Sequence, residues 1–430
     1  MTHRTDCEQL DRDDALAPLR DGFDLPATLT YLDGNSLGAL PRATAARVQD
    51  TVQRAWGQDL IKSWNSAGWM DLPQRVGDKI ARLVGANAGE LIVADSTSIN
   101  LYKALSAALT LVAQEAPQRK TLLSEASNFP TDLYIAESLA RERGLQLRLV
   151  DQADLVSALD DDVAVLLLTH VNYRSGRMLD MAALSSAAHQ CGALVVWDLA
   201  HSAGAVPVDL SGGGSAMAAA DFAVGCGYKY LNGGPGAPAF VWAHPRHASR
   251  MTQPLTGWMG HAAPFEFNPS YRPAPGIGRF LSGTPAVLAM TALECGVDTL
   301  LAAEPLGGML ALRTKSLALS ALFIDLVAQR CAGHPLTLAT PSEPALRGSQ
   351  VSYVHAQGGY AIMQALVARG VIGDFRAGDR AQGSEDLLRF GFTPVYTRFV
   401  DVWHAVDQLA QVLDSGEWQE ARFHQRAAVT

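Results

Sequence analysis

Three short apolar runs in the middle of the chain constrain its fold more than any other feature. They cover residues 163–168, 193–197 and 221–225, and helical periodicity over residues 182–190 separates the first two. Such short continuous apolar runs are typical of strands that are buried on both faces. Strands of this kind, alternating with helices, predict a mostly parallel sheet between two layers of helices. We therefore expect an α/β fold.

The sequence around these runs predicts further elements of the same architecture. Ser96 and Thr97 are good N-cap residues at the start of one helical segment. Gly- and Trp-rich residues 57–73 predict a loop. Strands are expected over residues 91–94, 121–123 and 145–150, and helices over residues 11–20, 43–56, 99–113 and 133–144.

A Pro- and Gly-rich stretch at residues 264–285 predicts a domain boundary. Beyond it, helices are expected over residues 286–302, 315–329, 361–370 and 402–413, and strands over residues 350–355 and 389–393. These form a smaller α+β unit. The predicted organisation is an N-terminal segment, residues 1–50, packing on the small domain, a large domain at 51–285 and a small C-terminal domain at 286–430.

Composition and charge exclude several classes of function. The 430 residues carry 34 Lys and Arg against 43 Asp and Glu, a net charge of −9. Proteins that coat nucleic acid or anionic membranes need clustered positive charge, so we expect neither partner. Five scattered cysteines lack zinc-site or CxxC spacing, so we predict no metal and a reducing compartment. The N-terminus has no signal-peptide pattern, and the expected location is the cytoplasm.

Two residues at successive predicted strand ends point to a reaction. Asp198 ends one apolar run, His201 follows three residues later, and Lys229 follows the next run in a Gly-rich segment. The sequence has no GxGxxG, GxxxxGK[ST], HExxH or GxSxG motif. Ligands bind at the carboxyl ends of strands in open α/β sheets. A lysine amine and a carboxylate there suit pyridoxal 5'-phosphate, whose aldehyde bonds to lysine and whose ring nitrogen pairs with an acid.

Simpler interpretations of these residues stay open at this point. Asp198 could cap a helix, and Lys229 could be a surface lysine. Ser96 and Thr97 could bind the phosphate at a helix N-terminus or serve only as caps. Phe129 could cover the cofactor ring or pack in the core, and Asp132 could be an ordinary first-turn acid.

Six short motifs resemble those of the kynureninase family. The resemblance runs from residue 34 through almost the whole chain. DLAH and GYKYLN are typical of the broader aminotransferase superfamily, whereas GNSLG, NFPTD and GWMGH are more particular to kynureninase. The motifs are DLAH at 198–201, GYKYLN at 227–232, NFPTD at 128–132, GNSLG at 34–38, GWMGH at 257–261 and RFGFTP at 389–394.

The resemblance implies a fold type I pyridoxal-phosphate enzyme, with a seven-stranded, mostly parallel sheet in the large domain. It implies cleavage of the Cβ–Cγ bond of L-kynurenine, or of its 3-hydroxy analogue, by water, in tryptophan catabolism or NAD biosynthesis. It also implies a homodimer whose active sites are shared between subunits. Carried over by position, the catalytic residues are Lys229, Tyr228 and Asp198; the cofactor contacts are Ser96, Thr97, Phe129, Asp132, Thr169, Asp198, His201, Tyr228, Lys229, Trp258 and Thr284; the substrate contacts are Arg389, Trp64 and Asn35.

The roles within this set differ. Lys229 would carry the cofactor, and Arg389 would clamp the substrate carboxylate as a bidentate fork. Trp258 and Thr284 would reach in from the partner subunit. Thr169 and Thr284 stand where the family motif allows Ser or Asn, and Thr284 leaves the substrate preference open.

Some alternatives remain at the level of the sequence. Arg376 is a rival for the carboxylate, and Trp64 with Trp69 could line a pocket or simply pack. His261 could serve the site or only its own loop. The same fold could instead support a cysteine desulfurase, with Cys331 as the late nucleophile, or an aminotransferase. A non-catalytic sensor that binds the cofactor or a metabolite is the third possibility.

Overall fold

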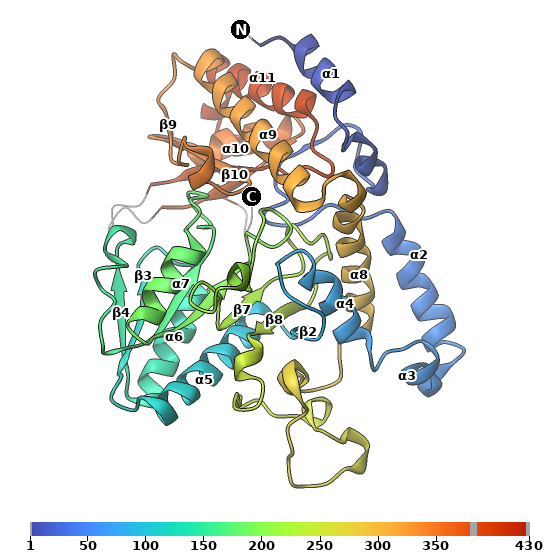
Figure 1. Cartoon of the computed structure of the whole chain (residues 1–430). Coiled ribbons are helices and arrows are strands. Elements are labelled where there is room, and N and C mark those ends of the chain that lie inside the picture. Colours follow the sequence, from blue (N-terminus) through green and yellow to red (C-terminus); the bar gives the residue numbers. More distant parts are fainter. Residues whose placement is uncertain (1, 379–384, 427–430) are drawn as a thin grey trace. The chain divides into compact units, whose positions relative to one another are not determined.

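The computed structural model describes residues 2–378 and 385–426, which form two compact units (Figure 1). Unit 1 comprises Met1–Ala43, Tyr173–Met178 and Thr299–Thr430, and unit 2 comprises Thr44–Asn172 and Leu179–Asp298. The second division falls inside helix α8 (Val287–Leu301). The boundaries expected after residues 50 and 285 differ from these divisions, and the short segment Tyr173–Met178 has no counterpart in the expected organisation.

Unit 2 is an α/β unit built on a seven-stranded sheet. Strands β7, β6, β5, β3 and β4 are parallel, whereas β8 runs antiparallel to both β2 and β7, and the order is β2-β8-β7-β6-β5-β3-β4. The expected mostly parallel, seven-stranded sheet is confirmed. Its strands are β2 (Leu91–Ala94), β3 (Thr121–Glu125), β4 (Gln146–Val150), β5 (Val163–Thr169), β6 (Leu194–Asp198), β7 (Phe222–Gly225) and β8 (Ala239–Ala243).

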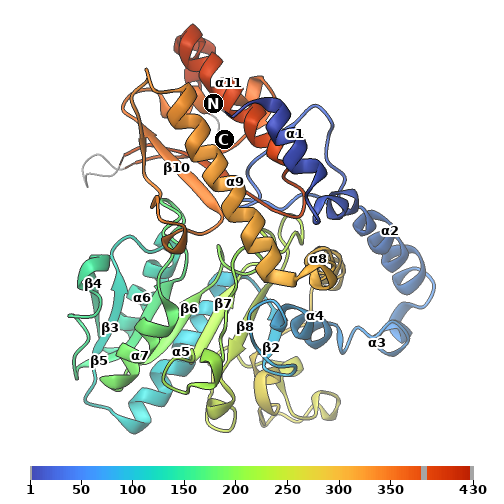
Figure 2. The same cartoon turned by 45° about the horizontal axis from the view of Figure 1, so that its top comes forward.

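Helices pack on both faces of this sheet (Figures 1 and 2). Successive side chains of β6 point to opposite faces of the sheet. Val196 packs in the core formed with α5, whereas the indole of neighbouring Trp197 donates to Ser185 of α7 at 3.1 Å. The α-helices of unit 2 are α2 (Ala43–Asp50), which continues as a π-helix over Thr51–Trp56, α3 (Ser63–Ser66), α4 (Leu72–Ala81), α5 (Thr97–Glu115), α6 (Pro130–Arg143), α7 (Met181–Gln190) and most of α8. Short 3-10 helices cover Leu60–Lys62, Gln152–Asp154, Gly212–Gly214, Pro245–His247, Trp258–Gly260, Pro264–Glu266 and Gly276–Phe280.

Unit 1 is an α+β unit. A four-stranded antiparallel sheet has the order β12-β13-β10-β9, and β1 pairs with β11 in parallel. Helix α1 lies beside α11 (Figure 2). The elements are α1 (Arg4–Arg12), β1 (Thr30–Tyr31), α9 (Gly308–Arg330), β9 (Leu336–Leu338), β10 (Gln350–His355), α10 (Gly359–Ala368), β11 (Val371–Ile372), β12 (Asp374–Arg376), β13 (Leu387–Gly391) and α11 (Phe399–Ser415), with 3-10 turns at Ala17–Gly22, Glu304–Leu306, Pro344–Leu346, Glu417–Gln419 and Ala421–His424.

Two local predictions were wrong, and one strand was missed. The helix expected over residues 11–20 is replaced by α1, which ends at Arg12, and by a 3-10 turn containing Pro18, a residue that cannot continue an α-helix. Asp11 instead accepts hydrogen bonds from Phe399 N at 2.7 Å and Val400 N at 3.0 Å and so caps α11. The segment expected as a loop at 57–73 contains α3 and the start of α4, and strand β8 was not expected.

No helix among the described residues is long and apolar enough to cross a membrane. All five cysteines carry free thiols.

Candidate active site

The carboxyl ends of β5 and β6 bring a buried acid to the edge of the sheet. Thr169 and Asp198 are register partners at the last position of these two strands. Asp198 is only 2% exposed, and its Oδ1 accepts a hydrogen bond from Ala200 N at 2.8 Å. The turn that follows β6 therefore fixes the carboxylate where ligands of parallel α/β sheets bind.

Asp132, in the first turn of α6, forms a hydrogen-bonded acid pair with Asp198. Burial and the negative charge of Asp198 raise the pKa of Asp132 well above its usual range, although the Lys229 charge opposes this shift. Burial also raises the pKa of Asp198, but Lys229 and the hydrogen bonds from Ala200 and Asp132 oppose that rise. Two carboxylates in contact retain a proton between them. We place it on Asp132, which leaves Asp198 as the anion.

Thr169 and Asn128 complete the support of this pair. Thr169 Oγ1 lies 3.5 Å from Oδ2 of both Asp132 and Asp198, and it donates to Asn128 Oδ1. Asn128 is held in turn by its own donation to Ser124 Oγ at 3.1 Å. Asn128 was missed as a site residue, although it stands in the NFPTD motif directly before Phe129.

Lys229 lies among the expected cofactor residues. Its Nζ is 2.9 Å from His201 Nε2, 6.0 Å from the centre of the Phe129 ring and 5.8 Å from the centre of the Tyr228 ring. An added Cβ at Gly227 would overlap with the Pro238 carbonyl oxygen. The glycine before Tyr228 is therefore required by close packing of the backbone that presents the lysine.

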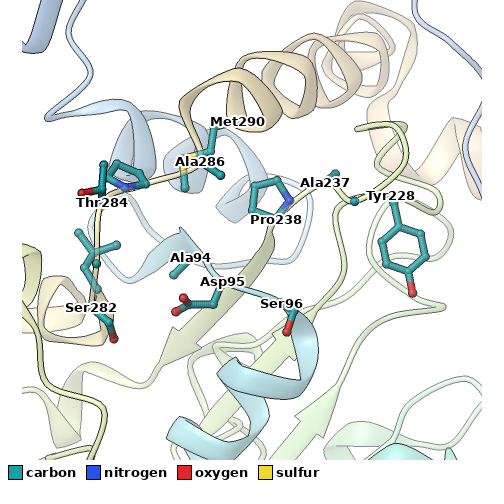
Figure 3. Close-up of a pocket in the computed structure, with 14 residues that line it drawn as sticks. Ala94, Asp95, Ser96, Tyr228, Ala237, Pro238, Ser282, Thr284, Ala286 and Met290 are labelled. Atoms are coloured by element: carbon teal, nitrogen blue, oxygen red, sulfur yellow. The ribbon is translucent and has the colours of Figure 1, made fainter.

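The N-terminus of α5 forms one wall of a cavity of about 490 Å³ (Figure 3). Ser96 is the N-cap residue, and its Oγ accepts a hydrogen bond from Ile99 N at 3.4 Å, while Thr97 begins the helix. Ser96, Tyr228 and Thr284 all line this cavity. Tyr228 joins this cavity to the lysine, because its ring centre lies 5.8 Å from Lys229 Nζ. A 19-residue helix that points its N-terminus into a cavity is well suited to a phosphate.

Trp64 and Trp258 contact each other edge to face, with ring centres 5.8 Å apart. Trp64 also meets Trp69, and Trp258 also meets Phe265, at 6.1 and 5.9 Å. His261 lies in the same loop as Trp258 and accepts from Ala263 N at 2.9 Å, so it stabilises the loop. The aromatic residues singled out in two distant parts of the sequence thus form one cluster within unit 2.

Arg389 and Asn35 belong to unit 1. Arg389 is 1% exposed, donates to Tyr173 O at 2.6 Å and Ser36 Oγ at 2.7 Å, and forms an ion pair with Asp374. The rival Arg376 is more accessible, with a side chain 38% exposed, and binds Asp374 at 2.7 Å. Both guanidinium groups therefore belong to one cluster.

Asn35 is fully buried, and an added Cβ at Gly391 would overlap with its Oδ1. Within the described part of the chain, no group hydrogen-bonds its side-chain amide. A buried amide of this kind is suited to a ligand contact.

The residues of unit 2 fit pyridoxal 5'-phosphate. The buried Asp198 anion matches a protonated ring nitrogen, the Phe129 ring matches a flat aromatic face and Lys229 matches the aldehyde. The cavity at the α5 N-terminus matches the phosphate.

Comparison with known proteins defines the class. Residues 30–324 match the family model of class-V aminotransferases. A cysteine desulfurase from Thermococcus onnurineus NA1 has a similar fold, with a TM-score of 0.74 and 18% identity over 93% of this chain and 98% of that chain. A variant of C-DES with glycine covalently linked to its pyridoxal-phosphate cofactor gives a TM-score of 0.77 and 17% identity over 91% and 98%. The protein is a fold type I enzyme that depends on pyridoxal phosphate.

Within this class the relatives are more specific. Residues 312–409 match the model of the kynureninase C-terminal domain. Kynureninase from Burkholderia pseudomallei (strain 1106a) is 55% identical, and kynureninase from Pseudomonas fluorescens is 53% identical, each over 433 residues and the full length of both chains. The chain belongs to the kynureninase family.

Proposed function

We propose that the enzyme hydrolyses L-kynurenine to anthranilate and L-alanine. The observation that carries this proposal is identity above 50% over the full length of kynureninases, in a chain whose acid pair and Lys229 form a site suited to the cofactor. The reaction adds one water molecule and breaks the bond between Cβ and the carbonyl carbon Cγ. Water oxygen ends on the anthranilate carboxyl group, and Cβ becomes the methyl group of alanine.

Bound pyridoxal phosphate supplies an electron-accepting ring conjugated to the substrate Cα. Asp198 would keep the ring nitrogen protonated, with Asp132 as its proton-bearing partner. Phe129 would cover the ring face, and His201 would lie beside the phenolic oxygen. Ser96 and Thr97 would bind the phosphate together with Tyr228.

Lys229 and Tyr228 would move the protons in this reaction. Lys229 Nζ would take the proton from Cα. It lies 2.9 Å from His201 Nε2 and beside the rings of Phe129 and Tyr228, which are the residues expected around the cofactor. The Tyr228 hydroxyl is the best candidate to assist proton transfer when water adds to the γ-carbonyl carbon and the Cβ–Cγ bond breaks.

Arg389 would bind the substrate carboxylate. Its contacts with Tyr173 O, Ser36 and Asp374 fix the orientation of the planar guanidinium, and such preorganisation favours bidentate binding of a carboxylate. Asn35 and Trp64 would contact the rest of the substrate. We expect L-kynurenine to be preferred over 3-hydroxy-L-kynurenine, because Thr284 offers no amide for a ring hydroxyl.

We further propose a homodimer in which Trp258 completes the partner's site. Thr284 was expected to do the same, but it lines the cavity of its own chain beside Ser96 and Tyr228. The loop after Trp258 exposes Phe265 and Phe267, the latter at 78%, and exposed aromatic clusters mark protein interfaces. Mixing Lys229→Ala and Trp258→Ala proteins, each of low activity, tests this arrangement. Random subunit exchange should restore intact sites to about a quarter of the total, whereas no recovery would contradict shared sites.

A cytoplasmic location and a role in tryptophan catabolism or NAD biosynthesis are further parts of the proposal. The five free cysteines support a reducing compartment.

A cysteine desulfurase is the weaker alternative. Cys331 caps the C-terminus of α9, is 2% exposed, and burial, with the Asp414 charge, raises its pKa to about 11. A thiol in this environment is a poor nucleophile. The two similar desulfurases share only 18% and 19% identity, which supports the fold and not the reaction.

Initial rates on three substrates test the proposed function. With added pyridoxal phosphate, L-kynurenine should give fluorescent anthranilate, 3-hydroxy-L-kynurenine should react more slowly, and L-cysteine should release no sulfide. Sulfide release without anthranilate would reverse the assignment. Absence of a visible cofactor band that borohydride can reduce would contradict both enzyme assignments.

A further inference from the structure

Lys103 is a fully buried lysine that the proposed mechanism does not use. It lies on α5 two turns after the N-terminus and is 0% exposed. Its Nζ donates to Asp95 Oδ2 at 2.6 Å and to the Phe280 carbonyl oxygen at 2.7 Å. Burial of an ammonium group is unfavourable unless it is paired and hydrogen-bonded, so these contacts explain how the lysine is accommodated.

The two partners of Lys103 belong to two chain segments that meet at the cavity that Ser96 lines. Asp95 itself lines the cavity, and Phe280 directly precedes the lining segment from Leu281 to Ala286 (Figure 3). The contact from Lys103 to Phe280 joins residues 177 positions apart in the sequence. One buried nitrogen therefore connects the Asp95 turn to the segment that starts at Phe280.

Asp95 adopts a backbone conformation that needs support. Its φ is +43°, in the left-handed region that residues other than glycine seldom adopt. Its carbonyl oxygen accepts from Ala239 N at 2.9 Å, and the neighbouring Ala94 carbonyl accepts from Asn100 Nδ2 at 2.7 Å. Together with the Lys103 contact, these bonds hold the turn that places Ser96 as the N-cap of α5.

Charge gives Lys103 a second effect. The Asp95 side chain is 33% exposed and lines the cavity, so its carboxylate would repel a phosphate dianion there. Lys103 neutralises that carboxylate from the buried side.

We propose that Lys103 is a positioning residue for the cofactor phosphate, which ties the Asp95–Ser96 turn to the Phe280 segment and neutralises Asp95. The inference rests on the proposed assignment of the phosphate to Ser96 and Thr97. It predicts that Lys103 governs the preference of the protein for pyridoxal 5'-phosphate over pyridoxal, which has the same ring and aldehyde but no phosphate.

Titration of cofactor-free protein with each compound measures that preference. The visible absorbance of the lysine-bound compound gives the Kd values of the parent, Lys103→Met and the control Lys120→Met, which changes an exposed lysine of the same unit. For Lys103→Met we expect the Kd for pyridoxal phosphate to rise about tenfold or more, as loss of a charge-assisted contact predicts, with the Kd for pyridoxal nearly unchanged. Lys120→Met should match the parent.

Two results would overturn the inference: an unchanged preference in Lys103→Met, or an equal loss of affinity for both compounds, which indicates general damage to the fold. Lys103→Arg provides the test if the Met variant does not fold. Arginine keeps the charge but cannot place one nitrogen between both oxygens, so a loss of about threefold is expected and full parental preference would contradict the geometry. Failure of the phosphate assignment is distinguishable, because the parent would then show no preference or Ser96→Ala would leave it intact.

Discussion

Asp33 provides a quantitative test of the electrostatics around Arg389. Burial raises the pKa of Asp33 to about 7, the Asp374 charge adds to this rise, and Arg389, Ser36 and Arg376 oppose it. The carboxyl of an unfolded chain titrates at about 3.9. Folding therefore favours the protonated form, and Asp33→Asn replaces that form by a neutral side chain of the same shape.

The expected magnitude follows from the two pKa values. Because the folded pKa lies above the unfolded one, the stabilising contribution of protonated Asp33 is complete below about pH 3.9 and is lost as the pH rises through about 7. At about 1.4 kcal/mol per pKa unit, the total is about 4 kcal/mol, of which about 3 kcal/mol is lost between about pH 4.5 and about pH 8. Asparagine does not ionise, so Asp33→Asn does not lose this contribution. Between these two pH values, the free energy of unfolding of the variant should therefore increase by that amount relative to the parent.

Equilibrium denaturation of the whole protein, followed at several pH values, measures the difference. Asp24→Asn is the control, since that side chain is exposed. The same reasoning predicts that the KM of the parent for L-kynurenine rises with pH through about 7, because ionised Asp33 weakens the attraction of Arg389 for a carboxylate. The rise should be smaller in Asp33→Asn. A stability difference that does not vary with pH would refute the reasoning.

Three further substitutions have direct expectations. Cys331→Ser should leave the steady-state rate on L-kynurenine within about twofold of the parent, because the thiol is buried and protonated, and a large loss would revive a catalytic thiol. Asp221→Asn should lower the free energy of unfolding by about 3 kcal/mol in thermal denaturation, because the buried carboxylate accepts several hydrogen bonds, including one from His189 at 2.8 Å, and an unchanged melting temperature would contradict this. Gly257→Ala should reduce turnover, because an added Cβ would overlap with the Ser282 carbonyl oxygen and displace the Trp258 loop, and a parental rate would show that the loop tolerates the shift.

Local patterns in the sequence predicted the frame of the fold. The three apolar runs correspond to β5, β6 and β7. They could be predicted because a strand buried on both faces needs apolar residues at consecutive positions. Strand β8 escaped prediction, since Gly and Pro around it indicate turns rather than a strand that runs antiparallel to its neighbours. The helix expected over residues 11–20 was wrong because the segment is fixed by a distant contact, from Asp11 to the start of α11.

Some residues of the site could likewise be recognised from the local sequence, whereas others depend on contacts between distant parts of the chain. Asp198 and Lys229 could be recognised because the first ends an apolar strand and the second stands in the Gly-rich segment after the next strand. The support of Asn128 for Thr169 joins residues 41 positions apart, and Lys103 reaches Phe280 across 177 positions. No spacing rule detects such pairs, because only the folded chain brings them together.

Product analysis of a single reaction tests the central claim most directly. Purified protein with pyridoxal phosphate and L-kynurenine should release anthranilate and L-alanine in equal amounts, and Lys229→Ala should release neither. Consumption of L-kynurenine with formation of any other product pair, or activity that survives in Lys229→Ala, would contradict the account.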